Sequence, residues 1–245
     1  MLKRSLPIPP DLIRDALAGS AARVVPLTHD GQKVWIKRLE HLSLLRRLQK
    51  GSAVTTFETE REALRELAGR GLPVPEILAE GPEFFVIPDC GPSLDHLLRG
   101  VVPTTDAERL DAFAAAGRAL AEMHRAHFSH GRPSLRDVCW LSGRATFVDF
   151  ERFAAFRNTA EGHAEDLVLF VFNGITLARG LTPELSRAIE SYRAEDPDHI
   201  WERAQDWCRR RRWINIATKP IQWRREGKSK EFKAIPKTLE VFGAI

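Results

Sequence analysis

The sequence predicts an α+β fold of two lobes, with a small β-rich N-terminal lobe followed by a larger helical C-terminal lobe. Two observations lead to this prediction. Short β-prone runs gather before residue 90, and apolar residues at helical spacing fill most of the remaining chain. With 245 residues, of which 43% are hydrophobic and 29% charged, the chain has the length and composition of a globular protein with a substantial core.

The first lobe is expected to contain two strands, a helix and a third strand. Arg23–Leu27 and Lys33–Lys37 flank a turn at Asp30-Gly31, and Asp-Gly between β-prone runs is a strong hairpin signal. Apolar residues at helical spacing predict a helix over Glu58–Ala68, which a glycine and two prolines then end. The apolar run Phe84–Ile87 predicts a buried strand.

The second lobe is expected to be mostly helical. Helical structure is predicted over Leu94–Leu98, about Asp106–His127, Asp166–Tyr192 and His199–Trp213. One strand, Ala145–Phe150, interrupts them and delivers a carboxylate at its end. The pattern changes from β-prone runs to helical spacing near residues 88 to 93. This change divides the chain into an N-lobe of residues 1–88 and a C-lobe of residues 89–245.

No feature of the sequence predicts a membrane span or a secretory signal. The longest uncharged apolar run, Leu167–Ala178, has about a dozen residues, while a bilayer crossing needs about 20. Met1–Pro10 carries two positive charges, but prolines and charges follow where a signal peptide needs an apolar stretch. Three widely separated cysteines suit a reducing compartment. We therefore expect a cytoplasmic protein.

The formal net charge of +4 is unevenly distributed. Residues from Arg209 to Lys237 include eleven Lys and Arg against two Glu, a local balance of +9, so the rest of the chain carries −5. Tryptophans are interleaved with these arginines, which suits the headgroup layer of an anionic membrane and also suits nucleic acid. A solvated helix face is the simplest alternative. The residues alone leave both partners open.

Lys37 is the first candidate site residue. It closes Val34–Lys37, which has the form of the strand that in protein kinases places a lysine against nucleotide phosphates. Glu60, on the next predicted helix, can hold such a lysine as an ion pair, and Glu62 is the competing candidate. A solvated strand-end lysine is the alternative.

The segment from His130 to Glu151 is the most informative stretch. A kinase catalytic loop runs from a histidine through a catalytic aspartate to a metal-binding residue, and an Asp-Phe-Gly element follows on a short strand. On that template His130 is the loop histidine, Asp137 falls at the metal-ligand position, and Asp149 is the carboxylate that holds magnesium. The sequence thus predicts a magnesium site formed by Asp137 and Asp149.

The order of these motifs resembles the bacterial lipopolysaccharide core kinases, the Kdo and heptose kinases, and most of all their InaA-like branch. The resemblance rests on Ile-Lys, Glu-x3-Leu-x2-Leu-x3-Gly-Leu-Pro-Val-Pro, a hinge strand, Met-His, His-Gly-x5-Asp and Val-Asp-Phe-Glu, over residues of about 20 to 175. It implies a protein-kinase-like fold, ATP and Mg as cofactors, and transfer of the γ-phosphoryl group to a sugar hydroxyl of a glycolipid at the inner membrane. The resemblance therefore favours an anionic membrane surface over nucleic acid as the partner of residues 209–237. By this likeness Lys37, Glu60 and Asp149 bind the nucleotide, and Asp137 and Asp149 bind the metal.

The sequence departs from the kinase pattern at two places. Arg132 stands where the catalytic aspartate is expected, and a guanidinium cannot accept a proton from a hydroxyl. Pairing Arg136 with Asp137 instead makes Asp137 the base, but that register leaves too little chain before Asp149. The glycine-rich loop is also missing, and only Gly19–Arg23 offers small residues before the first strand. The catalytic-loop candidates are therefore His130, Arg132 and Asp137, and the alternative function is a pseudokinase that binds nucleotide or a partner without turnover.

Three further polar residues are expected to be structural. Asp166 lies at a helix start, where related folds use an aspartate to brace the catalytic loop. His124 and His127, near the end of the long helix, are interpreted as core or interface residues, because no cysteine pairs with them at zinc spacing.

Overall fold

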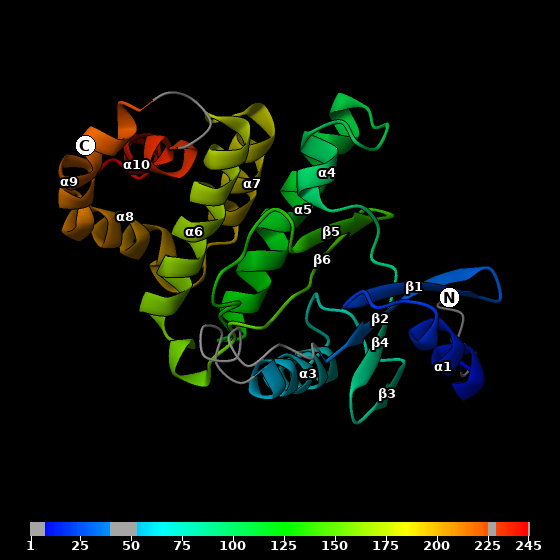
Figure 1. Ribbon diagram of the computed structural model, residues 1–245. Helices are drawn as coiled ribbons and strands as arrows, with labels where there is room; N and C mark the ends of the chain where they lie inside the picture. The colour runs from blue at the N-terminus through cyan, green and yellow to red at the C-terminus, as the bar shows by residue number, and fades with distance from the viewer. Residues whose placement is uncertain (1–7, 40–52, 225–228, 245) are drawn as a thin grey trace. The chain divides into compact units, whose positions relative to one another are not determined.

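The computed structural model describes residues 8–39, 53–224 and 229–244, and it separates into two compact units (Figure 1). The first unit runs to Cys90 and also takes in Asp149–Arg152. The second unit comprises Gly91–Val148 and the chain from Phe153 onwards. A short stretch of chain is therefore inserted into the first unit from within the second.

The first unit contains a four-stranded antiparallel sheet in the order β1-β2-β4-β3. Strands β1 (Val24–His29) and β2 (Gln32–Arg38) form the predicted hairpin, and both turn residues, Asp30 and Gly31, have positive φ. Aspartate and glycine adopt this conformation readily, which explains why they occupy the turn. Strands β3 (Ala79–Gly81) and β4 (Phe84–Pro88) complete the sheet.

Two helices accompany this sheet. Helix α1 (Pro10–Ala18) packs Ile13 into an apolar cluster with sheet residues that include Val25 and Ile36. Helix α3 (Ala53–Gly69) extends the predicted helix toward the N-terminus, and Phe57 of α3 contacts the ring of Phe85 on β4 at 5.2 Å between centroids.

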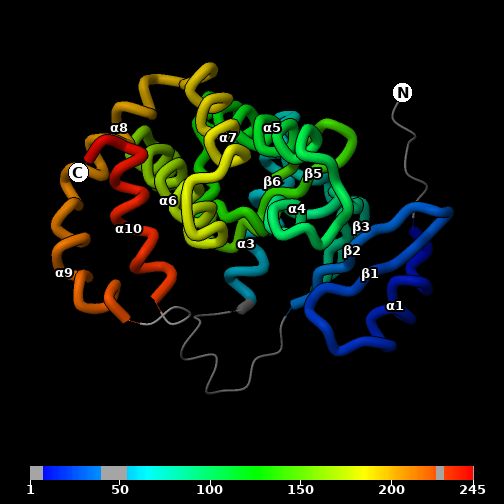
Figure 2. Tube along the Cα trace, turned by 90° about the horizontal axis from the view of Figure 1, so that it is seen from above, coloured from blue at the N-terminus to red at the C-terminus, as the bar shows by residue number. Residues whose placement is uncertain are grey.

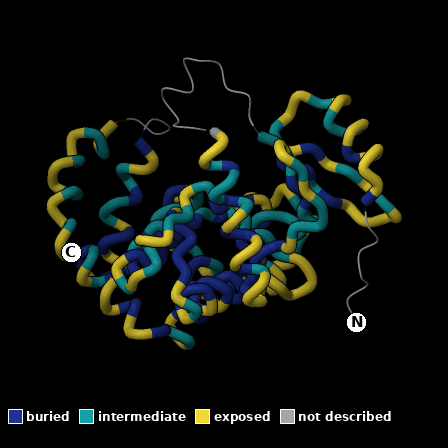
Figure 3. The backbone as a smooth tube through the Cα atoms, turned by 90° about the horizontal axis from the view of Figure 1, so that it is seen from below, coloured by how far each residue is buried: buried dark blue, intermediate teal, exposed yellow. Residues whose placement is uncertain are grey.

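The second unit is built around α6 (Ala160–Ala178). Helix α6 contacts α7 (Pro183–Ala194), α8 (Ile200–Arg211) and α10 (Lys230–Val241), and it is seen among them in the tube view (Figure 2). Helix α9 (Trp213–Gln222) follows α8 and contacts α10. Buried and exposed residues alternate along these helices, as expected when each helix packs by one side only (Figure 3).

Helix α5 (Asp106–Arg125) packs along α7 over much of its length. Its N-terminus is fixed by a capping box, in which the Thr105 hydroxyl accepts from the backbone N–H of Glu108 and the Glu108 carboxylate accepts from the backbone N–H of Thr105. A methyl group on Gly117 would lie 2.1 Å from the Ala188 carbonyl oxygen, so only glycine permits this approach of the two backbones.

A short helix, α4 (Leu94–Leu98), and a two-stranded hairpin of β5 (Val138–Leu141) and β6 (Arg144–Phe147) complete the unit, with short 3-10 turns at Ala155–Arg157 and Pro197–His199. No helix in the described ranges is long and apolar enough to cross a membrane.

The α+β fold class and the order of its main elements are confirmed. The sequence did not predict helices α1, α9 and α10, strands β3 and β5, or the two 3-10 turns, and the helical stretch expected over Asp166–Tyr192 is divided between α6 and α7. The strand expected over Ala145–Phe150 ends earlier, at Phe147, because Asp149 has a positive φ of 67° that a strand does not accommodate.

Candidate active site

Lys37 lies on β2 of the first unit, at the centre of a group of carboxylates. Its Nζ is 2.5 Å from Oε2 of Glu60, 3.1 Å from Oδ1 of Asp149 and 3.4 Å from Oε1 of Glu151. The lysine is buried, so its ammonium group depends on these oxygens for the interactions that water would otherwise supply. Three elements of one unit thus supply a charged cluster that we call the Lys37 cluster, consisting of Lys37, Glu60, Asp149 and Glu151.

Glu60 enters the cluster from the buried face of α3. Phe57, Ala63, Leu64 and Leu67 share that face with it, at spacings of three and four residues. Glu60 is only 2% exposed, whereas Glu62, the competing candidate, is exposed and points away from this face. Burial raises the pKa of Glu60, although the Lys37 charge opposes this increase. The structure therefore pairs Lys37 with Glu60.

The inserted segment Asp149–Arg152 supplies the other two carboxylates. Asp149 and Glu151 both approach Lys37, while Phe150 between them is buried. Asp149 has a positive φ, which aspartate tolerates better than most residues, and its side chain is 46% exposed. Glu151 also forms an ion pair with Arg23, the residue immediately before β1.

The Lys37 cluster has a donor set that suits a divalent cation. One carboxylate oxygen each from Glu60, Asp149 and Glu151 lies within 4.8 Å of the others. Oε1 of Glu151 is buried and is already paired with the cationic groups of Arg23 and Lys37, which shows that this position accommodates positive charge. Magnesium prefers such hard oxygen ligands, so these residues fit the ion.

The residues Gly19–Arg23 lead into β1. Gly19 ends α1, and the Arg38 guanidinium on β2 donates to the carbonyl oxygens of Leu17 and Ser20, at 3.3 and 2.8 Å. This segment is therefore fixed to the sheet by a side chain. Its expected role in covering phosphates stays a prediction.

In the second unit, Asp166 holds the loop that contains His130. Its carboxylate accepts from the backbone N–H groups of His130 at 2.5 Å and Gly131 at 3.0 Å. Asp166 is fully buried, and this burial raises its pKa to about 6. The side chain of His130 is turned inward, and its Nε2 donates to the Val148 carbonyl oxygen at 3.0 Å. The contacts of Asp166 are those of a brace for the loop.

A buried polar network lies behind this loop. His124 on α5 forms a hydrogen bond with the Tyr192 hydroxyl at 2.7 Å and stacks on His163, with ring centroids 4.6 Å apart. His163 in turn bonds the Ser129 hydroxyl at 2.8 Å. Burial lowers the pKa of both histidines to about 3, so both are neutral at physiological pH. His124 is thus a core residue, whereas His127 is exposed.

Asp137 and Arg132 lie on the same loop as His130. Asp137 is half-buried, and one of its carboxylate oxygens accepts from the backbone N–H of Ser134 at 3.1 Å, which closes a turn just before β5. Arg132 is exposed. The metal role of Asp137 and the catalytic roles of His130 and Arg132 stay predictions from the sequence.

Comparison with known proteins identifies the family. Residues 18–223 match the model of the APH phosphotransferase enzyme family, which is most of the chain. The chain belongs to this family. It is also 27% identical over 194 residues to an uncharacterized protein of Haemophilus influenzae strain Rd, covering 79% of the chain and 75% of that relative.

Membership of the APH family makes the chain a kinase-like phosphotransferase and implies that it uses ATP. This agrees with the kinase-like resemblance at the level of the superfamily. The lipopolysaccharide core kinases are a finer assignment, and neither comparison identifies the substrate of this APH-family chain.

Two members of the charged site were not predicted as site residues, Glu151 and Arg23. The signal for Glu151 in the sequence is its position two residues after Asp149 in the same Val-Asp-Phe-Glu motif. No comparable signal exists for Arg23, since its partner Glu151 is distant in sequence.

Proposed function

We propose that this APH-family phosphotransferase binds ATP through the Lys37 cluster and transfers the γ-phosphoryl group to a sugar hydroxyl of a lipopolysaccharide-type glycolipid. The observation that carries the nucleotide part is the buried Lys37 surrounded by three carboxylates. Kinases use such a lysine, held by a glutamate, to contact nucleotide phosphates, and a neighbouring aspartate to bind magnesium.

Each residue of the cluster has a distinct part in this proposal. Lys37 contributes positive charge toward the phosphates, and Glu60 holds the Lys37 ammonium in place from a buried position. Asp149, the most exposed of the three carboxylates, and Glu151 would hold the magnesium ion. Magnesium, when bound, neutralises phosphate charge. Asp137 remains the second metal ligand expected from the sequence.

The transfer breaks the bond between the γ-phosphorus and the oxygen that leaves with ADP, and it forms a bond from phosphorus to the sugar oxygen. The hydroxyl proton must then be released. Arg132 cannot take this proton, because a guanidinium stays protonated. Phosphoryl transfer draws most of its acceleration from positioning and charge neutralisation, so turnover is compatible with a weak base or with none.

Thermal unfolding with ATP and magnesium tests the nucleotide site. A ligand at about 100 times its dissociation constant adds about 2.7 kcal/mol, which raises the melting temperature of a protein of this size by about 5–10 °C. We expect this shift in the wild type and its loss in Asp149→Asn. The matched control is Asp30→Asn, which changes another aspartate of positive φ in the same unit. An equal shift in all three proteins would contradict the site.

Transfer of labelled phosphate from ATP to a purified lipopolysaccharide-type glycolipid tests the acceptor. Labelled glycolipid with the wild type and none with Asp149→Asn is the expected result. A magnesium-dependent thermal shift without transfer to any sugar would instead favour the pseudokinase.

Helix α9 supports an acceptor at a membrane surface. Trp213, Ile216 and Trp223 are 61%, 69% and 82% exposed, and they recur at spacings of three and seven residues along one face. Arginines at the end of α8 and Arg224 lie next to this apolar stripe in the sequence. An exposed apolar stripe beside cations is typical of a helix that lies in the headgroup layer of an anionic bilayer.

Flotation with phosphatidylglycerol vesicles tests this membrane contact. The wild type should float at low salt and less at high salt, because the attraction to anionic lipid is screened. Trp213→Ala/Trp223→Ala should lose flotation, whereas Phe156→Ala, which removes an exposed aromatic ring elsewhere in the second unit, should not. Binding that is indifferent to salt and to the tryptophans would contradict the proposal.

A further inference from the structure

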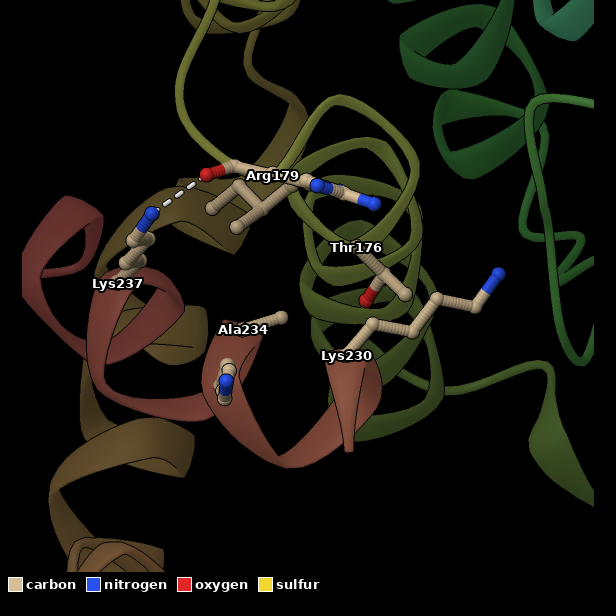
Figure 4. Close-up of a pocket in the computed structure, with 7 residues that line it drawn as sticks. Thr176, Arg179, Lys230, Ala234 and Lys237 are labelled. Carbon is tan, nitrogen blue, oxygen red and sulfur yellow. Dashed lines mark hydrogen bonds between the residues drawn. The ribbon is translucent and has the colours of Figure 1, made fainter. Parts of the chain in front are cut away.

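Positively charged side chains of the second unit, which is the helical one, surround a cavity between the end of α6 and one face of α10. The cavity has a volume of about 150 Å³ and is lined by Ile175, Thr176, Arg179, Lys230, Lys233 and Lys237, with Ala234 between the lysines (Figure 4). Four of these residues are cationic and none is acidic. We call this cavity the α6–α10 pocket.

The three lysines come from a single face of α10. Lys230, Lys233 and Lys237 are separated by three and four residues, the spacing that places side chains on one side of a helix. Within the described part of the chain, none of the three forms an ion pair with a carboxylate, although ion pairs are frequent elsewhere in this unit. Like charges gathered in this way repel one another, so the arrangement is suited to a negatively charged ligand.

The geometry of the pocket is fixed by backbone contacts. Lys237 donates from its Nζ to the carbonyl oxygen of Arg179, the residue that ends α6, as the dashed line in Figure 4 shows. Arg179 adopts a left-handed backbone conformation with φ of 63°. Thr176 is buried, and its hydroxyl donates to the Phe172 carbonyl oxygen at 2.8 Å, so it has no proton left for a ligand. The hydrogen-bond donors of the α10 side of the pocket are therefore its lysine side chains.

The size and charge of the pocket select the chemical class of its ligand. Pockets for drug-sized molecules measure about 300–1,000 Å³, so this smaller one suits a single group and not a whole large molecule. A phosphate monoester carries about −1.5 to −2 charges at neutral pH and offers three acceptor oxygens, which matches several cations better than one carboxylate does. Ile175 and Ala234 add an apolar wall that suits the organic part of such a ligand.

We propose that the α6–α10 pocket binds the phosphate monoester group of an organic phosphate, at a site separate from the nucleotide site. The Lys37 cluster belongs to the other structural unit, and within the helical unit Thr176 lies ten residues beyond Asp166, about 15 Å along α6. The pocket does not depend on the proposed phosphotransferase function, and it accounts for three of the lysines in the basic C-terminal segment.

Calorimetric titration with glycerol 3-phosphate tests the proposal, because this ligand is a soluble phosphate monoester. We expect saturable binding to the wild type and at least about tenfold weaker binding to Lys230→Gln/Lys233→Gln, which removes two of the phosphate-binding charges. The matched control Arg118→Gln/Arg144→Gln removes two exposed charges from the same unit outside the pocket and should bind like the wild type. Both double variants are expected to keep the melting temperature of the wild type.

A second titration separates this pocket from the nucleotide site. Lys37→Met should lose the ATP-dependent thermal shift and still bind glycerol 3-phosphate. Glycerol 3-phosphate binding that is lost in Lys37→Met and kept in Lys230→Gln/Lys233→Gln would overturn the proposal, as would absence of binding to the wild type. Loss of ATP binding in a protein that keeps the pocket would count against the proposed function alone.

Sedimentation with vesicles that contain phosphatidic acid distinguishes the source of the phosphate group. Weaker sedimentation of Lys230→Gln/Lys233→Gln than of the control double variant supports a lipid monoester as the ligand. Equal sedimentation of the two variants, together with tenfold weaker binding of glycerol 3-phosphate by the pocket variant, supports a soluble organic phosphate. If the two double variants behave alike in both assays, the α6–α10 pocket is not a phosphate site.

Discussion

Replacement of Lys37 by methionine should destabilise the protein even without any ligand. The substitution keeps most of the apolar stem and removes the charge, leaving Glu60 buried and unpaired. Removing one partner of a buried ion pair costs about 3–5 kcal/mol. Asp149 is nearly half exposed and can regain water, so it adds little to this cost. We take about 3 kcal/mol as the net effect.

This free energy corresponds to a fall in melting temperature of about 6–12 °C at pH 7.5, since 1 kcal/mol shifts a protein of this size by about 2–4 °C. Circular dichroism during heating measures the change. Lys33→Met is the matched control on the same strand, because Lys33 is exposed and contacts the Trp35 ring and Asp89 only at the surface. Its effect should stay below about 1 kcal/mol.

The pH dependence of the Lys37→Met effect identifies its cause. Burial already raises the pKa of Glu60, and loss of the lysine raises it further. A carboxyl group whose pKa is raised on folding contributes stability below its unfolded pKa and loses it as the pH rises through the folded value. The gap between wild type and Lys37→Met should therefore be smaller at pH 5 than at pH 8.

A rescue experiment completes the argument. Adding Glu60→Gln to Lys37→Met replaces the unpaired carboxylate by a neutral group of similar shape and should recover at least half of the lost stability. Three results would refute the reasoning: a single variant that melts within about 2 °C of the wild type, a gap that is as large at pH 5 as at pH 8, or a second substitution that restores nothing.

Three other changes have definite expected outcomes. Gly117→Ala should cost about 1–3 kcal/mol in thermal unfolding, because its methyl group would meet a backbone carbonyl of α7, whereas Gly69→Ala, with no atom within 4 Å, should cost nothing. Burial raises the pKa of Asp166 from 3.8 to about 6. The stability of the wild type relative to Asp166→Asn should therefore fall by about 3 kcal/mol as the pH rises from 4 to above 6. Denaturant unfolding at several pH values measures this difference. Glu151→Gln should raise the magnesium concentration needed for half of the ATP-dependent thermal shift by about tenfold, while Glu62→Gln should leave it unchanged.

The elements that could be predicted from the sequence are those that local physics specifies. The β1–β2 hairpin has an Asp-Gly turn between β-prone runs, and α5 begins at a capping box and carries a long apolar face. Two strands that were not predicted, β3 and β5, have weak local signals. Strand β3 has only three residues, and β5 has four residues that directly follow the turn closed by Asp137. Both exist because a neighbouring strand pairs with them, and pairing between strands is not encoded in either strand alone.

The same distinction applies to the charged site. Lys37 and Glu60 could be predicted because one lies near the end of a strand of characteristic form and the other lies on the apolar side of a helix. Arg23 could not, since its role is defined by Glu151, which reaches it only when the segment Asp149–Arg152 joins the first unit. Glu151 follows Asp-Phe at the position where kinases have glycine, so the kinase template does not identify it as a site residue.

The basic C-terminal segment shows what a charge count leaves undecided. The sequence presents residues 209 to 237 as one cationic stretch, to which a single anionic partner is assigned. The structure divides it by environment: α9 exposes an apolar stripe, whereas the lysines of α10 line a cavity together with Arg179 at the end of α6. Removal of an apolar stripe from water is favourable, and so is the binding of a negative charge in a small cationic cavity. The two halves of the segment therefore suit different ligands. Trp213→Ala/Trp223→Ala removes the apolar contribution and Lys230→Gln/Lys233→Gln removes the charge of the cavity, so each double variant should weaken one interaction and leave the other in place.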